Sequence, residues 1–224
     1  MKESRIFERV DQFISNQFSR DDAPLKAVEK SLGVSGISNI SVSSSQGKFL
    51  HVLARLCQAK RILEIGTLGG YSTIWMARAL PAKGMLLSIE NNVKHASLAT
   101  KNIDRAGLAG RVEIRVGNAH DVLTELEREN VPLFDMVFID ADKTSYDRYF
   151  RHALNLTHVG SLIVVDNVIR QGKVLDAKST DENVIGARQF LHTLARSKKV
   201  TATVLQTVGP KGHDGMAIAV RCAD

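Results

Sequence analysis

Cysteine is scarce in this sequence: only Cys57 and Cys222 are present, and they do not form a Cys-x-x-Cys pair. A disulfide framework and a thiolate metal site are therefore not indicated, and both residues are expected to be free thiols. Aromatic residues make up only 5% of the chain, so a platform for stacking nucleic-acid bases is not evident. No apolar run approaches the roughly 20 residues that span a bilayer, and the charged first residues, 1–5, do not resemble a signal peptide. We therefore expect a cytoplasmic protein with no membrane partner.

The rest of the composition is ordinary for a globular protein, with 44% apolar and 24% charged residues. A chain of 224 residues fits one domain, so we expect a single domain over 1–224, with a helical N-terminal extension at 1–45 inside it. The formal net charge of +6 would suit a polyanion such as RNA. Because the basic residues are scattered along the chain, a solvated basic surface is the simpler interpretation.

Short apolar runs alternate with helical patterns through most of the chain. Helices are predicted at 6–18, 23–32 and 46–57, then at about 70–80, 92–106, 118–129 and 144–156, and last at 182–197. Strands are predicted at 61–65, 85–90, 111–116, 134–139 and 159–165, and then at 200–207 and 215–220. The alternation indicates parallel βαβ units, and the last two strands are close enough to pair as an antiparallel end of the sheet. The pattern predicts an α/β fold with a seven-stranded, mostly parallel sheet.

The turn after the first predicted strand combines glycines with an acidic residue. Gly66, Gly69 and Gly70 let backbone approach a ligand closely, but they lack the Gly-x-Gly-x-x-Gly spacing of a dinucleotide site. Glu64 precedes this turn and would suit the cationic end of a sulfonium amino acid cofactor. Glu90 ends the second strand, 20 residues after Gly70, where a carboxylate can hold both ribose hydroxyls. Together the two carboxylates indicate an adenosine with a positively charged tail.

Acidic and amide side chains also follow two later strands. Asp140 and Lys143 come directly after the run that ends at 139, and Asp166 and Asn167 follow the run that ends at 165. Ligands bind at the carboxyl ends of strands in open α/β sheets, and carboxylate and amide oxygens suit hard divalent cations. Taken singly, each residue could instead cap a turn or a helix, which is a common use of Asp and Asn.

These motifs together resemble a known family. Glu64-Ile65-Gly66-Thr67 with Tyr71-Ser72, Phe138-Ile139-Asp140-Ala141-Asp142-Lys143 and Asp166-Asn167 are similar to the metal- and S-adenosylmethionine-dependent O-methyltransferases, which include the catechol and caffeoyl-CoA enzymes. The resemblance runs from about residue 40 to the C-terminus and implies a Rossmann-like class I methyltransferase fold. It also implies a homodimer and a bound divalent metal, Mg²⁺ first, with Mn²⁺ or Ca²⁺ as other choices.

The resemblance assigns roles to individual residues. It implies a catalytic role for Lys143 and metal ligation by Asp140, Asp166 and Asn167. The implied cofactor contacts are Val42, Glu64, Gly66, Thr67, Gly70, Ser72, Glu90, Ala119, His120 and Asp140. The segment 168–173 is expected to cover the acceptor, and it differs from the Leu-Trp pair that many relatives carry there.

These residues are consistent with three functions. The first is methyl transfer from S-adenosylmethionine to a hydroxyl of a small catechol-like or polyphenolic acceptor. The second is the same chemistry on a hydroxylated uridine in tRNA, which the positive net charge permits. The third is a non-catalytic protein that binds an adenosine ligand, which would not need Asp140, Lys143, Asp166 and Asn167 together.

Overall fold

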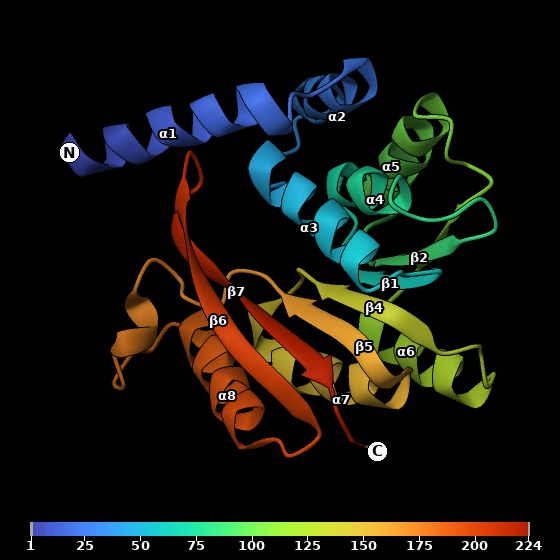
Figure 1. The fold of residues 1–224 in the computed structure, drawn as a ribbon, viewed down its shortest axis with the longest axis vertical. Helices are drawn as coiled ribbons and strands as arrows, with labels where there is room; N and C mark the ends of the chain where they lie inside the picture. Colours follow the sequence, from blue (N-terminus) through green and yellow to red (C-terminus); the bar gives the residue numbers. More distant parts are fainter. Residues whose placement is uncertain (1, 224) are drawn as a thin grey trace.

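In the computed structural model, which describes residues 2–223 and side chains from Ile6 onward, the chain forms one sheet with helices on both faces (Figure 1). The helices are α1 (Lys2–Phe18), α2 (Ala23–Val34), α3 (Ser44–Leu56), α4 (Tyr71–Ala77), α5 (Val93–Arg105), α6 (Ala119–Arg128), α7 (Tyr146–Asn155) and α8 (Glu182–Arg196), with short 3-10 helices η1 (Lys143–Ser145) and η2 (Lys173–Leu175). The strands are β1 (Arg61–Ile65), β2 (Met85–Glu90), β3 (Val112–Val116), β4 (Phe134–Ile139), β5 (Thr157–Val165), β6 (Val200–Gly209) and β7 (Gly212–Arg221). The predicted single domain over 1–224 stays a prediction, and its first and last residues lie outside the described part.

The described residues form a seven-stranded sheet in the order β3-β2-β1-β4-β5-β7-β6. The first five strands are parallel, and β7 pairs antiparallel with both β5 and β6. This confirms the predicted fold class. The β6–β7 hairpin is longer than predicted, because its pairing continues from the apolar residues down to Gly209 opposite Gly212. The strands were predicted from alternating apolar residues, but backbone hydrogen bonds between strands can continue past the last of these residues.

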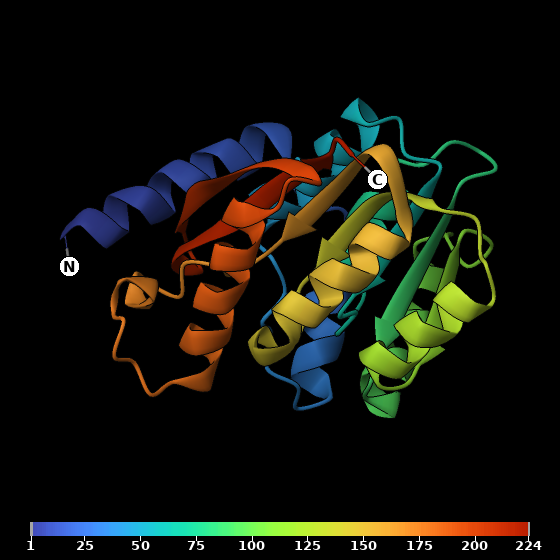
Figure 2. The same cartoon turned by 90° about the horizontal axis from the view of Figure 1, so that it is seen from below.

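The core lies in two layers, one on each face of the sheet, because successive residues of a strand point to opposite faces. Ile62 and Phe138 pack in a cluster with residues of α2 to α5, whereas Leu63 and Ile139 pack in a cluster with residues of α6 to α8. Figure 2 shows α6, α7 and α8 (yellow-green to orange) side by side on the second face. The packing of both layers fixes the strands in position. The carboxyl ends of the parallel strands therefore lie together along one edge of the sheet.

The N-terminal helices lie outside the sheet. Helix α2 packs on α4 and α5, and Asp22 caps its first turn by accepting a hydrogen bond from the backbone of Leu25. Helix α1 contacts α3, and it also contacts β6 near the tip of the hairpin (Figure 1). Where α1 meets β6, a Cβ added to Gly209 would lie 3.3 Å from Cγ of Asp11. Helix α1 thus reaches the side of the molecule where the strands end.

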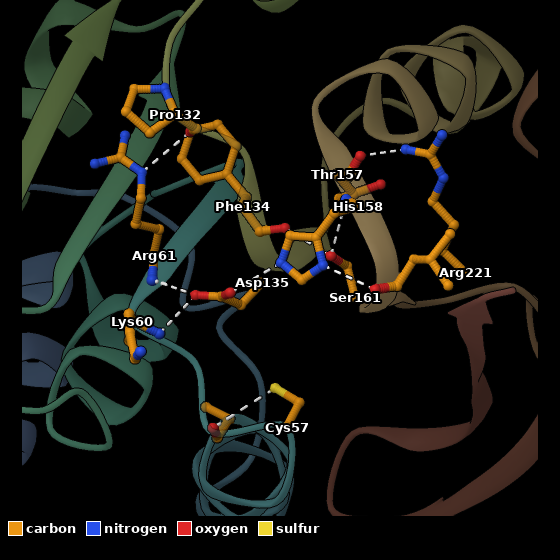
Figure 3. A network of polar contacts seen from close by, with 12 residues as sticks. Cys57, Lys60, Arg61, Pro132, Phe134, Asp135, Thr157, His158, Ser161 and Arg221 are labelled. Carbon is orange, nitrogen blue, oxygen red and sulfur yellow. Dashed lines mark hydrogen bonds and ion pairs between the residues drawn. The ribbon is translucent and has the colours of Figure 1, made fainter. Parts of the chain in front are cut away.

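A polar network connects the amino ends of β1, β4 and β5, at the end of the sheet opposite the carboxyl ends of the parallel strands (Figure 3). Asp135 Oδ2 accepts hydrogen bonds from the backbone N–H groups of Lys60 and Arg61, and Asp135 Oδ1 lies 3.0 Å from Nε2 of His158. Burial opposes ionisation of Asp135, but its hydrogen bonds, the one from His158 foremost, lower its pKa below the usual value. The network holds three adjacent strands in register.

None of the helices in residues 2–223 combines the length and apolar character needed to cross a membrane.

Candidate functional site

A cavity of about 470 Å³ opens at the carboxyl ends of β1, β2 and β4. In a sheet of this order, neighbouring connections diverge between β1 and β4, which is where ligands bind in open α/β folds. Seven of the predicted cofactor contacts line the cavity, namely Val42, Gly66, Thr67, Ser72, Glu90, Ala119 and Asp140. The other three, Glu64, Gly70 and His120, do not line it. The predicted roles of all ten residues stay predictions.

The glycine turn after β1 is shaped by a close approach to β4. Gly66 has φ of +100°, and a side chain there would overlap the backbone carbonyl oxygen of Asp140. The backbone N–H of Asp140 in turn donates to the carbonyl oxygen of Ile65 at 2.9 Å. Only glycine satisfies both the backbone angle and the space. The turn therefore fixes where the Asp140 side chain enters the cavity.

Glu90 supports this turn from β2. Its Oε2 accepts hydrogen bonds from the backbone N–H groups of Thr67 (3.2 Å) and Leu68 (2.9 Å), and its Oε1 accepts one from Asn92 (2.9 Å). Leu68 has φ of +49°, an unfavourable angle for a residue with a side chain, and the Glu90 hydrogen bond helps to hold it there. Each carboxylate oxygen can accept more than one hydrogen bond, so Glu90 keeps capacity for a ligand in the cavity that it lines.

Glu64 lies beneath the turn and is fully buried. Ser72 Oγ and Thr73 Oγ1 donate to it at 2.5 Å, and Ser88 Oγ donates at 2.6 Å. Burial raises the pKa of Glu64 to about 7, and the three hydroxyl donors offset only part of that effect. Ser72 lines the cavity and stands between it and Glu64. The structure places Glu64 behind the cavity wall, where it positions Ser72.

His120 and Gly70 also lie away from the cavity lining. His120 is exposed at the start of α6, and its Nδ1 lies 2.8 Å from Nε2 of His152, whose Nδ1 contacts Glu127 at 2.7 Å. Gly70 has φ of +85° and precedes the first turn of α4. Its role in the structure is to reverse the chain into that helix.

The three predicted metal ligands come together between this cavity and a second one of about 570 Å³. Asp140 lines the first cavity, Asp166 lines the second, and Asn167 lines both. Asp166 is 2% exposed, and its Oδ1 accepts the backbone N–H of Asn167 at 2.8 Å. Asn167 has φ of +55°, a left-handed angle that Asn tolerates better than most residues. The three predicted metal ligands therefore line two adjoining cavities that share Asn167.

The electrostatics of this group fit a cation. Burial, together with the charge of Asp140, raises the pKa of Asp166 well above its usual value. A bound divalent ion would relieve that repulsion and favour the ionised carboxylates. No group of three or more His, Cys, Asp or Glu side chains in the described residues is arranged to hold a metal. The predicted set differs from such a group because its third member is an amide, a donor suited to Mg²⁺ and Ca²⁺.

Lys143 begins η1 directly beside these residues. Its Nζ lies 3.0 Å from Oδ1 of Asp140 and 5.2 Å from the ring centroid of Tyr146, and its side chain is 11% exposed. Tyr146 is fully buried and donates its hydroxyl to the carbonyl oxygen of Asp166 at 2.7 Å. A side chain at Gly186 of α8 would overlap the Lys143 carbonyl, so the glycine allows α8 to pack against η1. The ammonium is held in a nearly buried position that faces the first cavity.

Several other residues also line these cavities. Arg170 lines both cavities, and Tyr149 lines the first while it donates its hydroxyl to Asp142. Asp214 lines the second cavity, and its Oδ1 accepts hydrogen bonds from the backbone N–H groups of Ile169 and Arg170. These residues belong to segments that are distant in sequence, so no local spacing connects them. The expected acceptor loop at 168–173 was the available signal for Arg170.

The comparisons with known proteins agree with this geometry. The sequence profile described as O-methyltransferase matches residues 16–222. A catechol O-methyltransferase from Niastella koreensis is 56% identical over 217 residues, which cover 97% of this chain and 98% of that protein. A catechol O-methyltransferase from Mycobacterium tuberculosis is 45% identical over 211 residues, which cover 94% of each chain.

Solved structures with the same fold include proteins crystallised with a cofactor. The O-methyltransferase TomG from Streptomyces achromogenes, in complex with SAM, matches with a TM-score of 0.96 and 44% identity over 100% of both chains. An O-methyltransferase from Bacillus cereus, in complex with SAH, matches with a TM-score of 0.95 and 45% identity over 97% of this chain and 99% of that chain.

Proposed function

The chain belongs to the O-methyltransferase family, and we propose that it transfers a methyl group from S-adenosylmethionine to one hydroxyl of a small catechol-like or polyphenolic acceptor, with a divalent metal at the site. The observation that carries the proposal is the pair of cavities that share Asn167, with Asp140 on one side and Asp166 on the other. Two relatives named as catechol O-methyltransferases support the choice of acceptor.

The first cavity is the proposed cofactor site. Glu90 lines it at the end of β2 and would accept hydrogen bonds from the ribose hydroxyls. Asp140, with 23% of its side chain exposed, would receive the ammonium of the methionine portion. Ser72 and the Gly66 turn complete the wall on the same side. The sulfonium of the cofactor supplies the electrophilic methyl group, so these residues serve to bind and orient it toward the second cavity.

The second cavity is the proposed acceptor site. Asp166 and Asn167 line it, and together with Asp140 they would hold a cation that lowers the pKa of a chelated hydroxyl. Lys143 lines the first cavity next to Asp140. As a neutral amine it would take the proton from the reacting hydroxyl, and as an ammonium it would stabilise the resulting oxyanion. Phe49 offers an aromatic surface in the same lining. Holding the acceptor oxygen in line with the methyl carbon and the sulfur of the cofactor would account for a large part of the rate enhancement.

The assay that tests this function measures methyl transfer from labelled S-adenosylmethionine to catechol and to unmodified and hydroxylated tRNA, each at two salt concentrations. We expect turnover of catechol that depends little on salt, because a neutral small acceptor releases no counterions on binding. Methylation of tRNA with steep salt dependence, and none of catechol, would instead favour the RNA alternative. Binding of the cofactor with no methyl transfer to any acceptor would favour the non-catalytic alternative.

We also propose that the protein is a homodimer and that α1 contributes to the interface. Phe13 and Phe18 of α1 are 64% and 69% exposed, and Leu205 and Val208 of the edge strand β6 are also exposed. Exposed apolar area of this kind commonly marks an interaction surface. Sedimentation equilibrium should give twice the chain mass, and the double variant Phe13→Glu/Phe18→Glu should give the mass of one chain. A monomeric wild type at micromolar concentration would contradict this proposal.

A further inference from the structure

Arg170 occupies an unusual position between the two cavities. It lies in the loop between β5 and η2, and its side chain lines both cavities. Its Nε is buried and has no hydrogen-bond partner among the described residues. A buried donor without a partner is unfavourable, since it has lost its water without gaining an acceptor. An acceptor supplied by a ligand would satisfy it.

The backbone around Arg170 is held in an unfavourable conformation. Arg170 and Gln171 have φ of +54° and +58°, angles that residues with a side chain seldom adopt, and Gly172 follows at +79°. Strain of this kind persists only where the surroundings impose it, and it occurs often at ligand-binding positions. The conformation therefore needs a structural cause.

That cause is an attachment of the loop to β7. Asp214 Oδ1 accepts the backbone N–H groups of Ile169 at 2.9 Å and Arg170 at 3.0 Å, and the N–H of Val168 donates to the Gly215 carbonyl oxygen at 3.1 Å. A Cβ on Gly215 would lie 2.5 Å from Cγ1 of Ile169, so the glycine permits this close packing. The loop is fixed before any ligand arrives, and so is the point from which the Arg170 side chain extends.

Within the described residues, the two cations that line the second cavity, Arg170 and Lys211, form no ion pair with an acidic side chain. Lys211, at the tip of the β6–β7 hairpin, lines the same cavity, and among the described residues its Nζ donates only to the Asn39 carbonyl oxygen at 3.2 Å. Two of the acidic residues of the lining are engaged elsewhere: Asp214 binds backbone N–H groups, and Asp11 accepts the hydroxyl of Ser45. Asp166 is assigned to the proposed metal. An entering anion therefore meets two cations that form no ion pair with the acidic residues of the lining, while Asp11 and Asp214 keep their negative charge.

The second cavity is also larger than a bare catechol requires. Its volume of about 570 Å³ lies within the range of roughly 300–1,000 Å³ that is typical for drug-sized ligands. Arg170 and Lys211 line this cavity together with Asp166 and Asn167. An acceptor that fills the cavity would therefore contact the two cations as well as the proposed metal ligands.

We propose that the preferred acceptor is an anionic catechol, a dihydroxyphenyl ring bearing a carboxylate, and that Arg170 is the residue that selects it, with Lys211 in support. The inference rests on the proposed catechol O-methyltransferase function and specifies the acceptor of that same site. The planar guanidinium presents parallel N–H donors that match a carboxylate, and such charge-assisted pairs are stronger than neutral hydrogen bonds.

The test compares acceptors that differ only in charge. Dihydroxybenzoate, with its hydroxyls at the 3 and 4 positions, is compared with the matching dihydroxybenzamide, and the longer dihydroxycinnamate with its amide. Each acceptor is assayed for kcat and KM with saturating S-adenosylmethionine and Mg²⁺. We expect the wild type to favour at least one acid over its amide by about tenfold in kcat/KM, chiefly through KM, as the loss of one charge-assisted contact implies. In Arg170→Gln the ratio of acid to amide should fall to about one.

Three further variants separate selection from a general structural effect. Arg170→Lys keeps the charge and should keep part of the preference, and Lys211→Gln should reduce the preference partly. Lys173→Gln is the matched control, because it removes the same charge three residues from Arg170, at the start of η2, and Lys173 lines neither cavity. That variant should keep the full wild-type ratio.

The outcomes distinguish this inference from the function on which it rests. Turnover of the amides with no preference for either acid would overturn the selection by Arg170 and leave the catechol O-methyltransferase function standing. An unchanged ratio in Arg170→Gln, or a weaker Kd for S-adenosylmethionine in place of a changed ratio, would also overturn it. If neither acids nor amides are methylated, the proposed function fails and the inference fails with it.

Discussion

Methyl transfer is expected to fall by about 100-fold or more when divalent cations are removed with a chelator, and to return when Mg²⁺ is added. The physical reason is the acceptor hydroxyl, which is mostly protonated at neutral pH and needs a nearby cation to become a good nucleophile. Lys143 alone is a weak substitute, since its ammonium is already paired with Asp140 at 3.0 Å. Initial rates measured after stringent metal removal, with and without added Mg²⁺, check this expectation. Full activity in metal-free protein would show that the role given to Asp140, Asp166 and Asn167 is wrong.

The variant Asp166→Asn separates the metal site from the rest of the protein. It keeps the size of the side chain but removes a buried carboxylate that is repelled by Asp140. We therefore expect the metal-free variant to be at least as stable as the metal-free wild type, whereas Mg²⁺ should raise the Tm of the wild type only. The matched control is Asp142→Asn, two residues from Asp140, which should still bind Mg²⁺. Equal stabilisation of wild type and Asp166→Asn by the metal would contradict the assignment.

The variant Lys143→Met is expected to lower kcat by about 100-fold, within the range for loss of an acid–base or electrostatic catalyst. Methionine fills a similar volume without a charge, so the packing against Tyr146 is largely kept. The Kd for S-adenosylmethionine should change much less than kcat, because Lys143 is assigned to the acceptor oxygen. Single-turnover rates and calorimetric titration measure the two quantities. Unchanged turnover would remove Lys143 from the mechanism.

The variant Lys143→Arg then distinguishes the two chemical roles. Arginine keeps the positive charge but does not give up its proton in proteins. If Lys143 stabilises an oxyanion, the arginine variant should recover much of the rate lost in Lys143→Met. If Lys143 takes the proton, the arginine variant should stay as slow as the methionine variant and lose the pH dependence of kcat that belongs to the lysine.

The sheet and the approximate location of the site could be predicted because local sequence carries that information. Apolar runs such as 134–139 and 159–165 marked buried strands, and the polar residues directly after them had to meet at one edge of a parallel sheet. That reasoning predicted that Asp140, Asp166 and Asn167 would be neighbours, and all three line the adjoining cavities. Periodicity did not predict where the β6–β7 hairpin ends.

Other features depended on which atoms meet in three dimensions. Glu64 and Glu90 were both expected to contact the cofactor, yet Glu64 is enclosed by Ser72, Thr73 and Ser88 while Glu90 reaches the cavity. Both are acidic residues in adjacent strands, but Glu64 pairs with Ser88, two residues before Glu90, so Glu64 lies deeper in the sheet. His120 likewise points to His152 across α6 and α7, a contact that spans 32 positions in the sequence.

The amino-acid sequence by itself determined the α/β order of the chain and the chemical groups at the strand ends, because strand periodicity and residue type are local properties. Only the tertiary structure decided how those groups share two cavities, and that Arg170 stands between them with a buried, unpartnered Nε. The reason is that the Arg170 loop takes its conformation from Asp214 and Gly215 of β7, more than 40 residues away in sequence. A contact made over that distance leaves no spacing or periodicity that local sequence can reveal.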